Sequence, residues 1–252
     1  MKTTLYKNVD LVQIPIQKGV DEYYFPQNVS WAKERIDKIV ICAPQAACVS
    51  PIDGVTPVMQ RGDLQDMYLS IFTTEDKEIM HDVYFSELLH TNNYPVQIDA
   101  ELNLSVCRLY FRTAPQQNAC LLIYVFYGSE SVEDYEPATR SVTVRFPLAA
   151  NAQISFQEII NTYIHALPAK VRAIYCWNAE SSPAYLTLRD HELTYILRDV
   201  HSELCRRQMV GSSAETTQVH PFYVDNIDID FDYSYVRNAM DSESIQTITF
   251  DF

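Results

Sequence analysis

Short runs in which apolar and polar residues alternate dominate the chain. Typical examples are "VQIPIQ" (12–17), "MYLSIF" (67–72) and "VTVRFP" (142–147). A period of two is the pattern of a β-strand with one buried and one exposed face. Turn-forming stretches such as "SPIDG", "TNNYP" and "APQQN" separate the runs. The pattern therefore predicts antiparallel β-sandwiches.

Helical periodicity is confined to two short stretches. "FQEIINTYIHAL" (156–167) carries apolar residues along one stripe and predicts a helix. A shorter helix is predicted over 198–209. We therefore expect one or two short helices in a mainly β protein.

The runs recur in the same order in the two halves of the chain. The clearest pair, "IDAELNLSVCR" (98–108) and "IDIDFDYSYVR" (227–237), aligns without gaps. The other matching segments are 12–17 with 142–147, 37–44 with 171–178, 67–72 with 184–189, 86–89 with 202–205, and 119–127 with 244–252. This order predicts an internal duplication with a period of about 125–130 residues.

An acidic stretch, "GSESVEDYEPATRS" (128–141), lies between the halves and has the composition of a connector. We expect a first β-sandwich with an N-terminal arm over 1–128, a linker over 129–140, and a second β-sandwich over 141–252. The predicted fold is thus two tandem antiparallel, jelly-roll-like β-sandwiches related by internal duplication.

The charge of the chain narrows the classes of partner. Lys and Arg total 19 against 33 Asp and Glu, for a net charge of −14. Such a surface repels phosphate backbones, and only Arg206 and Arg207 form an adjacent basic pair, so no direct nucleic-acid binding is expected. No apolar run is long enough to predict a membrane span, and the start of the chain lacks the apolar core of a signal peptide.

The six cysteines are scattered, and most of them lie in apolar, strand-like runs. They form no CxxC pair and no Cys/His cluster with zinc spacing. We expect buried, reduced thiols in a protein made inside a cell.

The acidic run "YVDNIDIDFDY" (223–233) resembles a calcium loop at first sight. Asp228, Asp230 and Asp232 fit the opening of an EF-hand loop, but Tyr233 stands where that loop needs glycine and Ala239 where it needs glutamate. Ile and aromatic residues alternate with the aspartates, which predicts an amphipathic strand with one acidic face. A cation site at these three aspartates is the alternative interpretation.

No motif predicts catalysis. His191 and His201 lie in "RDHELTYILRDVHSE" (189–203) among acidic residues, but their spacing matches no metal motif. There is no G-x-S-x-G elbow, and no cysteine has a recognisable catalytic histidine partner nearby in sequence. We expect a protein that is not an enzyme and uses no cofactor; metal-dependent hydrolysis through the two histidines is the alternative.

Two short motifs have simpler structural explanations. The tripeptide Arg61-Gly62-Asp63 is predicted to be a turn rather than an integrin-binding motif. Asn28 and Asn103 fit the glycosylation sequon, but no secretion signal supports glycosylation.

The aromatic content leaves a sugar-binding function open, because β-sandwiches use aromatic platforms to stack sugars. Trp31 and Trp177 both flank matching segments of the two halves, which suggests structural positions.

The matching segments, the two halves of similar length and the short connector together resemble the double jelly-roll capsid proteins of icosahedral viruses. The resemblance implies a non-enzymatic structural protein that self-assembles into a multicopy shell. Its partners would be copies of itself and other virion proteins, and it would be assembled in the host cytoplasm and reside in the virion. A portal, neck or tail ring protein, or a binding module for a glycan or a protein, are the alternatives.

The stretch "DEYYFPQNVSWAKERIDKIVI" (21–41) is similar in character to structural proteins of phages that infect Bacteroidetes. That resemblance also implies a shell or neck component.

Overall fold

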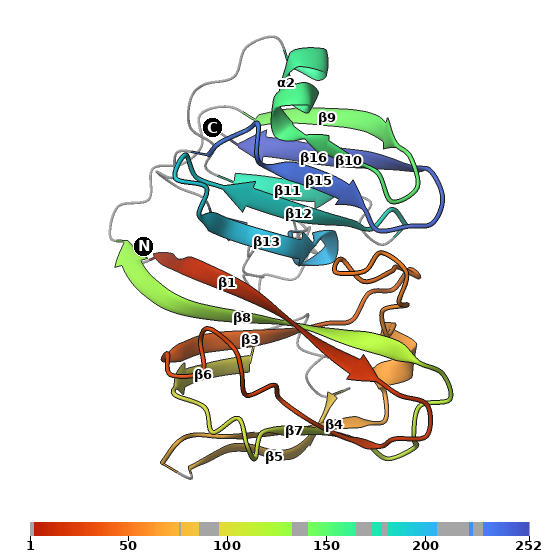
Figure 1. Cartoon of the computed structure of the whole chain (residues 1–252). Helices are drawn as coiled ribbons and strands as arrows, with labels where there is room; N and C mark the ends of the chain where they lie inside the picture. The colour runs from red at the N-terminus through yellow and green to blue at the C-terminus, as the bar shows by residue number, and fades with distance from the viewer. Residues whose placement is uncertain are drawn as a thin grey trace, which may run out of the picture. The chain divides into compact units, whose positions relative to one another are not determined.

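The computed structural model describes residues 3–75, 77–85, 96–132, 141–164, 173–177, 181–205, 222–223 and 229–251. The chain divides into two compact units (Figure 1). One unit is Tyr6–Glu130, and the other is Ser131–Phe252 together with Met1–Leu5. We call them the N-terminal and C-terminal rolls.

Two four-stranded antiparallel sheets form the N-terminal roll, with strand orders β1-β8-β3-β6 and β2-β7-β4-β5. The strands are β1 (Thr3–Ile16), β2 (Glu22–Tyr24), β3 (Ile36–Cys42), β4 (Met67–Phe72), β5 (Glu78–Tyr84), β6 (Val96–Ala100), β7 (Arg108–Phe111) and β8 (Ala119–Val132). Alternate residues of both sheets, among them Leu69, Ile71, Leu121 and Ile123, belong to one buried apolar cluster. The period-two pattern thus buries one face of each sheet in a shared core.

The C-terminal roll also has two four-stranded sheets, with orders β14-β11-β16-β9 and β10-β15-β12-β13. Its strands are β9 (Ser141–Leu148), β10 (Gln153–Ser155), β11 (Ala173–Trp177), β12 (Ala184–Arg189), β13 (Tyr195–His201), β14 (Phe222–Tyr223), β15 (Tyr235–Asn238) and β16 (Ser244–Asp251). Helix α2 (Phe156–Tyr163) follows β10, and the short 3₁₀ helices η1 (Arg61–Leu64) and η2 (Ser202–Cys205) lie in the N-terminal and C-terminal rolls respectively.

Both rolls have the same topology. When the strands of each roll are numbered from one to eight in chain order, the sheets of both read 1-8-3-6 and 2-7-4-5. This is the strand order of a jelly roll, in which two Greek keys close a double sheet. The predicted fold class, mainly β with antiparallel jelly-roll-like sandwiches, is confirmed.

The hairpins β4–β5 and β12–β13 share their register as well. Tyr68 pairs with Tyr84 in one hairpin, as Tyr185 pairs with His201 in the other. Each hairpin then has a β-bulge directly after the second residue pair, between Leu69 and Ile71 or between Leu186 and Leu188. The two rolls therefore agree in residue register and in the position of an irregularity.

The strand predicted over 227–233 is wrong for the residues that the structure describes. Ile229 makes a single antiparallel bridge to Asp190, and residues 231–233 form a turn before β15. The Asp230 carboxylate causes the turn, because its Oδ1 accepts hydrogen bonds from the amides of Asp232 and Tyr233 at 3.0 and 3.3 Å.

The turn also corrects the alignment of the two halves. Leu102 bridges Thr73 in the N-terminal roll as Ile229 bridges Asp190 in the C-terminal roll, so Leu102 corresponds to Ile229. The gapless alignment paired Leu102 with Phe231 and is therefore two residues out of register.

Helix α2 confirms the start of the first predicted helix. The Ser155 hydroxyl caps it by accepting a hydrogen bond from the Glu158 amide at 3.1 Å, and Ile164 ends it. The helix predicted over 198–209 is wrong for its first part, which is the end of β13 followed by η2. Residues 165–167 and 206–209 of the two predicted helices lie outside the described residues.

Two features of the expected domain organisation differ in detail. The N-terminal arm is strand β1, a member of a sheet. Strand β8 runs to Val132, into the stretch expected as a linker, and residues 133–140 lie outside the described residues. Within the described ranges, no helix is long and apolar enough to cross a membrane.

Candidate functional site

The face of sheet β2-β7-β4-β5 that points away from the core carries two cross-strand rows of side chains. Tyr23, Leu69 and Leu109 belong to the buried cluster, so their neighbours along each strand point to the opposite face. The first row, which we call the tyrosine row, is Tyr110, Tyr68 and Tyr84, with Glu22 at its end. The second, the polar row, is Tyr24, Arg108, Ser70 and Asp82.

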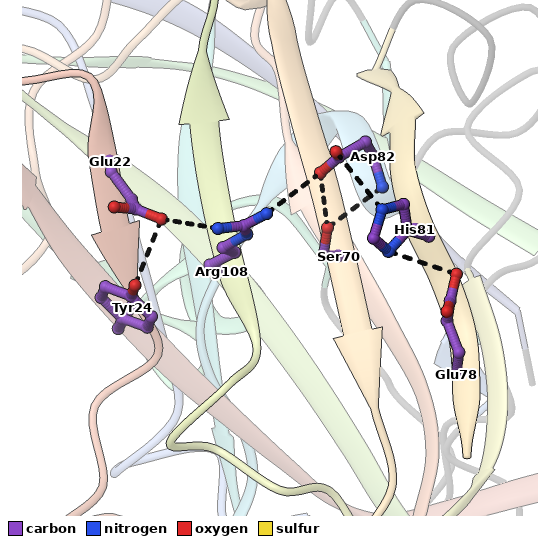
Figure 2. A network of polar contacts seen from close by, with 7 residues as sticks. All are labelled: Glu22, Tyr24, Ser70, Glu78, His81, Asp82 and Arg108. Atoms are coloured by element: carbon purple, nitrogen blue, oxygen red, sulfur yellow. Dashed lines mark hydrogen bonds and ion pairs between the residues drawn. The ribbon is translucent and has the colours of Figure 1, made fainter. Parts of the chain in front are cut away.

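Arg108 is the centre of the polar row (Figure 2). Its Nη1 donates to Glu22 Oε1 at 2.9 Å, and its Nη2 lies 3.7 Å from Asp82 Oδ1. The Tyr24 hydroxyl donates to the same Glu22 oxygen at 3.2 Å. The hydrogen bond to Glu22 raises the pKa of Arg108, so the guanidinium stays charged and is held between two carboxylates.

Asp82 is fixed by its backbone as well as by its side chain. It has a positive φ of 46° and lies in the bulge opposite Ser70. The Ser70 hydroxyl donates to Asp82 Oδ1 at 2.9 Å and accepts from the Asp82 amide at 3.0 Å. His81 continues the network, with Nε2 3.6 Å from Asp82 Oδ2 and Nδ1 3.3 Å from Glu78 Oε1 (Figure 2).

The C-terminal roll repeats this clamp with other residues. Asp199 has a φ of 47°, its amide donates to Thr187 Oγ1 at 3.1 Å, and the Thr187 hydroxyl donates back to Oδ1 at 3.4 Å. Arg237 of β15 places Nη2 3.6 Å from the same Oδ1. Burial raises the pKa of Asp199, while Arg237, Arg198 and the Thr187 hydroxyl act in the opposite direction.

Aromatic contacts connect the tyrosine row across three strands. The ring centroids of Tyr68 and Tyr84 are 4.1 Å apart, and those of Tyr68 and Tyr110 are 6.1 Å apart. Arg112 Nη1 donates to the Tyr84 hydroxyl at 3.4 Å, which fixes the end of the row.

The tyrosine row has no counterpart in the C-terminal roll. Arg237 takes the place of Tyr110, and Tyr185 and His201, which take the places of Tyr68 and Tyr84, are buried. The two rolls thus share a backbone scaffold and a clamp but present different chemistry on this face.

The aspartates proposed as a cation site are only partly described. Asp228 lies outside the described residues, and Asp230 and Asp232 lie at the turn before β15. Asp230 already accepts the two amide hydrogen bonds, and its Oδ2 is 3.5 Å from His191 Nδ1. Among the described residues, no three His, Cys, Asp or Glu side chains are grouped to hold a metal ion.

His191 and His201 do not come together. His191 lies in the exposed turn of the β12–β13 hairpin, whereas His201 ends β13 opposite Tyr185, at the other end of that hairpin. Burial lowers the pKa of His201 to about 4, which keeps the ring neutral at physiological pH.

The other candidate motifs have structural positions. Arg61-Gly62-Asp63 begins η1, where Asp63 Oδ2 accepts from the Gln60 amide at 2.9 Å, so the predicted turn is confirmed. Trp31 is buried in the core, and the Trp177 side chain lies outside the described residues. All six cysteines are buried, as predicted.

No sequence pattern indicates the tyrosine row, because its members come from strands far apart in the chain. A signal for the clamps did exist. Ser70 and Asp82 are 12 residues apart, as are Thr187 and Asp199, and Ser70 and Thr187 lie at the same position of the matching segments 67–72 and 184–189.

No protein-family model matches the chain, and no curated protein matches it. Among solved structures, it is similar to the major capsid protein P2 of bacteriophage PM2, with 9% identity, a TM-score of 0.22, and coverage of 100% of this chain and 96% of that one. It is also similar to a chain from the atomic structure of Sulfolobus Turreted Icosahedral Virus, with 12% identity, a TM-score of 0.22, and coverage of 100% and 89%.

These likenesses are weak. A TM-score of 0.22 is too low to show a shared fold, and the strand order in Figure 1 is independent of both matches. Neither match concerns a phage of Bacteroidetes, so that resemblance has no support.

Proposed function

We propose that the protein is a non-enzymatic structural subunit of a virus particle that assembles in many copies into a shell. The observation that carries the proposal is the jelly-roll strand order, which occurs twice in one chain. Jelly rolls form the domains of many viral capsid proteins. A tandem pair is the organisation of the double jelly-roll capsid proteins that the sequence resembles.

Two rolls in one chain suit such a subunit physically. Copies of one fold with different surfaces give each subunit two similar but non-identical sets of contacts, from which a closed shell can be built. The shared register of the β4–β5 and β12–β13 hairpins supports descent of both rolls from one ancestral roll. The net charge of −14 limits non-specific association outside the designated contacts.

Negative-stain electron microscopy of the purified, expressed chain tests the proposal. We expect capsomer-like oligomers of uniform size or closed polyhedral shells. Rings with an open central channel would instead indicate a portal, neck or tail ring protein. Fields without any particle at high protein concentration would contradict assembly of either kind.

A further inference from the structure

The tyrosine row and the polar row lie next to each other on one exposed face of the N-terminal roll. Tyr24 and Tyr110 are 50% and 37% exposed. We propose that this face is a binding platform for a neutral oligosaccharide. The tyrosine row would stack on the sugar rings, and the polar row would hydrogen-bond to the hydroxyl groups.

The tyrosine row brings three aromatic rings into mutual contact, with Tyr110 the exposed ring at one end. Its three side chains come from neighbouring strands, which are about 4.8 Å apart, and the ring centroids are separated by 4.1 and 6.1 Å. A pyranose has one face of C–H bonds, and that face packs on the negative face of an aromatic ring. Tyr84 is held by Arg112 and by its contact with Tyr68, so little side-chain entropy remains to be lost on binding.

The polar row supplies fixed donors and acceptors beside this surface. Arg108 is held from both sides, by Glu22 and by Asp82, and a guanidinium has five N–H donors. Asp82 is fixed further by Ser70 and by its own backbone. Pairs of adjacent donors and acceptors match the vicinal hydroxyl groups of a sugar, which donate to carboxylates and accept from guanidinium groups.

The charge of the face favours a neutral sugar over an anionic one. Arg108 is already paired with two carboxylates, and Glu78 adds a third acid at the end of the network. With Arg112 beside Tyr84, the three acids still outnumber the two guanidinium groups, so a sialic acid, sulfate or phosphate group would meet net negative charge.

The size of the face favours a small ligand over a protein. Four strands and two rows span roughly 14 Å by 7 Å at ordinary strand spacing and rise. A stable protein interface buries about 800 Å² on each partner, several times this area. An oligosaccharide of a few rings covers the face fully.

The test uses the labelled full-length chain on an array of neutral and sialylated glycans, followed by titration with the best neutral oligosaccharide. We expect binding to neutral glycans, and a loss of about tenfold or more in affinity for Tyr110→Ala, because the exposed ring of the tyrosine row is removed. Tyr110→Phe keeps the ring and should stay within a few-fold of wild type. Tyr233→Ala is the matched control, since Tyr233 is 55% exposed but belongs to the C-terminal roll.

Three results of the binding test, and a fourth from oligomer mass, would overturn the proposal. One is an array without neutral-glycan binding by the wild-type chain. Another is equal loss of affinity in Tyr110→Ala and Tyr233→Ala, and the third is selective binding of sialylated glycans. A change in oligomer mass caused by Tyr110→Ala without any glycan would identify the face as a protein interface instead. The binding test does not depend on shell assembly, so the two proposals can fail separately.

Discussion

Cys107 and Ser234 make the same pair of hydrogen bonds in the two rolls. Cys107 Sγ accepts from the Phe72 amide at 3.3 Å and donates to the Phe72 carbonyl oxygen at 3.4 Å. Ser234 Oγ accepts from the Arg189 amide at 2.9 Å and donates to the Arg189 carbonyl oxygen at 3.5 Å. In each roll, this side chain lies directly before the seventh strand, β7 or β15. It hydrogen-bonds to the last residue of the fourth strand, β4 or β12.

The equivalence of these two residues predicts that they are interchangeable. Cys107→Ser should change the free energy of unfolding by less than about 1 kcal/mol, because the hydroxyl can make both bonds. Cys107→Ala should destabilise by about 1–3 kcal/mol, since the Phe72 amide loses its acceptor and a small cavity remains. Urea denaturation of both variants measures the difference, and equal stability of Ser and Ala at this position would contradict the equivalence.

Because the backbone of Asp199 is left-handed, we expect the protein to be more stable with glycine than with alanine at this position. Asp199→Gly and Asp199→Ala both remove the clamp to Thr187 and Arg237. Only alanine retains a Cβ at a φ of 47°, which costs about 1–2 kcal/mol. Asp199→Gly should therefore unfold at higher urea concentration than Asp199→Ala. The opposite order, which is usual inside a strand, would show that the backbone is not held at positive φ.

Because the His201 ring is buried in its neutral form, we expect the C-terminal roll to lose stability in acid. Its ring is fully buried, and its pKa falls to about 4 in the folded state from an ordinary value of about 6.5. The unfolded chain therefore binds a proton at a higher pH than the folded chain does. This contribution to stability is complete above about pH 6.5 and is lost as the pH falls towards 4, by about 3 kcal/mol in total.

Denaturation at a series of pH values tests the effect of His201. The variant His201→Gln cannot titrate and should show a flatter pH dependence than wild type between pH 6.5 and 4. Parallel curves for the two proteins would mean that His201 is not the group responsible.

Lys38 is a second buried ionisable group, and we expect its replacement by an apolar residue to stabilise the protein. Burial lowers its pKa to about 7, and its Nζ lies 4.3 Å from the centroid of the Phe126 ring. The charged form is favoured in the unfolded chain, so the stability of the N-terminal roll should rise as the pH increases from 7 to about 10.5.

Lys38→Met keeps the aliphatic packing and removes the charge. It should stabilise the protein at pH 7 by about 2 kcal/mol, measured as an increase in Tm or in the urea midpoint. The exposed Lys33→Met is the control and should have little effect. A destabilised Lys38→Met variant would mean that the contact with Phe126 outweighs the desolvation of the ammonium group.

We expect the exposed turn at residues 52–55 of the N-terminal roll to contact neighbouring subunits. Ile52 and Val55 are 64% and 74% exposed, and the turn that carries them is braced by Asp53, whose Oδ1 accepts from the amides of Val55 and Thr56 at 3.0 and 2.9 Å. Exposed apolar side chains on an ordered turn suit contacts between subunits.

Ile52→Ser combined with Val55→Ser should shift the oligomer distribution towards smaller species in sedimentation experiments, while the melting temperature of the chain stays near that of wild type. Leu193→Ser, on the exposed tip of the β12–β13 hairpin, is the matched control. An unchanged oligomer distribution in the double variant would show that this turn takes no part in the assembly contacts.

The sequence predicted the sheets well because one buried face imposes a period of two on strands such as β1, β7 and β9. It also paired β4 with β12 in the correct register. The pairing of 98–108 with 227–237 failed by two residues because strict alternation looks the same after a shift of two. The turn at Asp230 was not predicted either. It depends on a hydrogen bond from a backbone amide to the Asp230 side chain, and the apolar pattern does not indicate such bonds.

The tyrosine row and the polar row could not be predicted from the sequence, for a different reason. Glu22, Arg108 and Asp82 are brought together only by the jelly-roll order, which places β2 beside β7 and β7 beside β4. No local pattern in the chain marks Tyr68, Tyr84 and Tyr110 as neighbours. Their proximity follows from strand pairing, which alternation alone does not specify.

The mass of the purified protein in solution tests the central claim, assembly into a multicopy shell, most directly. The chain has a mass of 29.1 kDa. Sedimentation velocity over a wide range of protein concentration should reveal a discrete, high-mass oligomer or shell whose fraction grows with concentration. A single 29.1 kDa species at every concentration would contradict the claim.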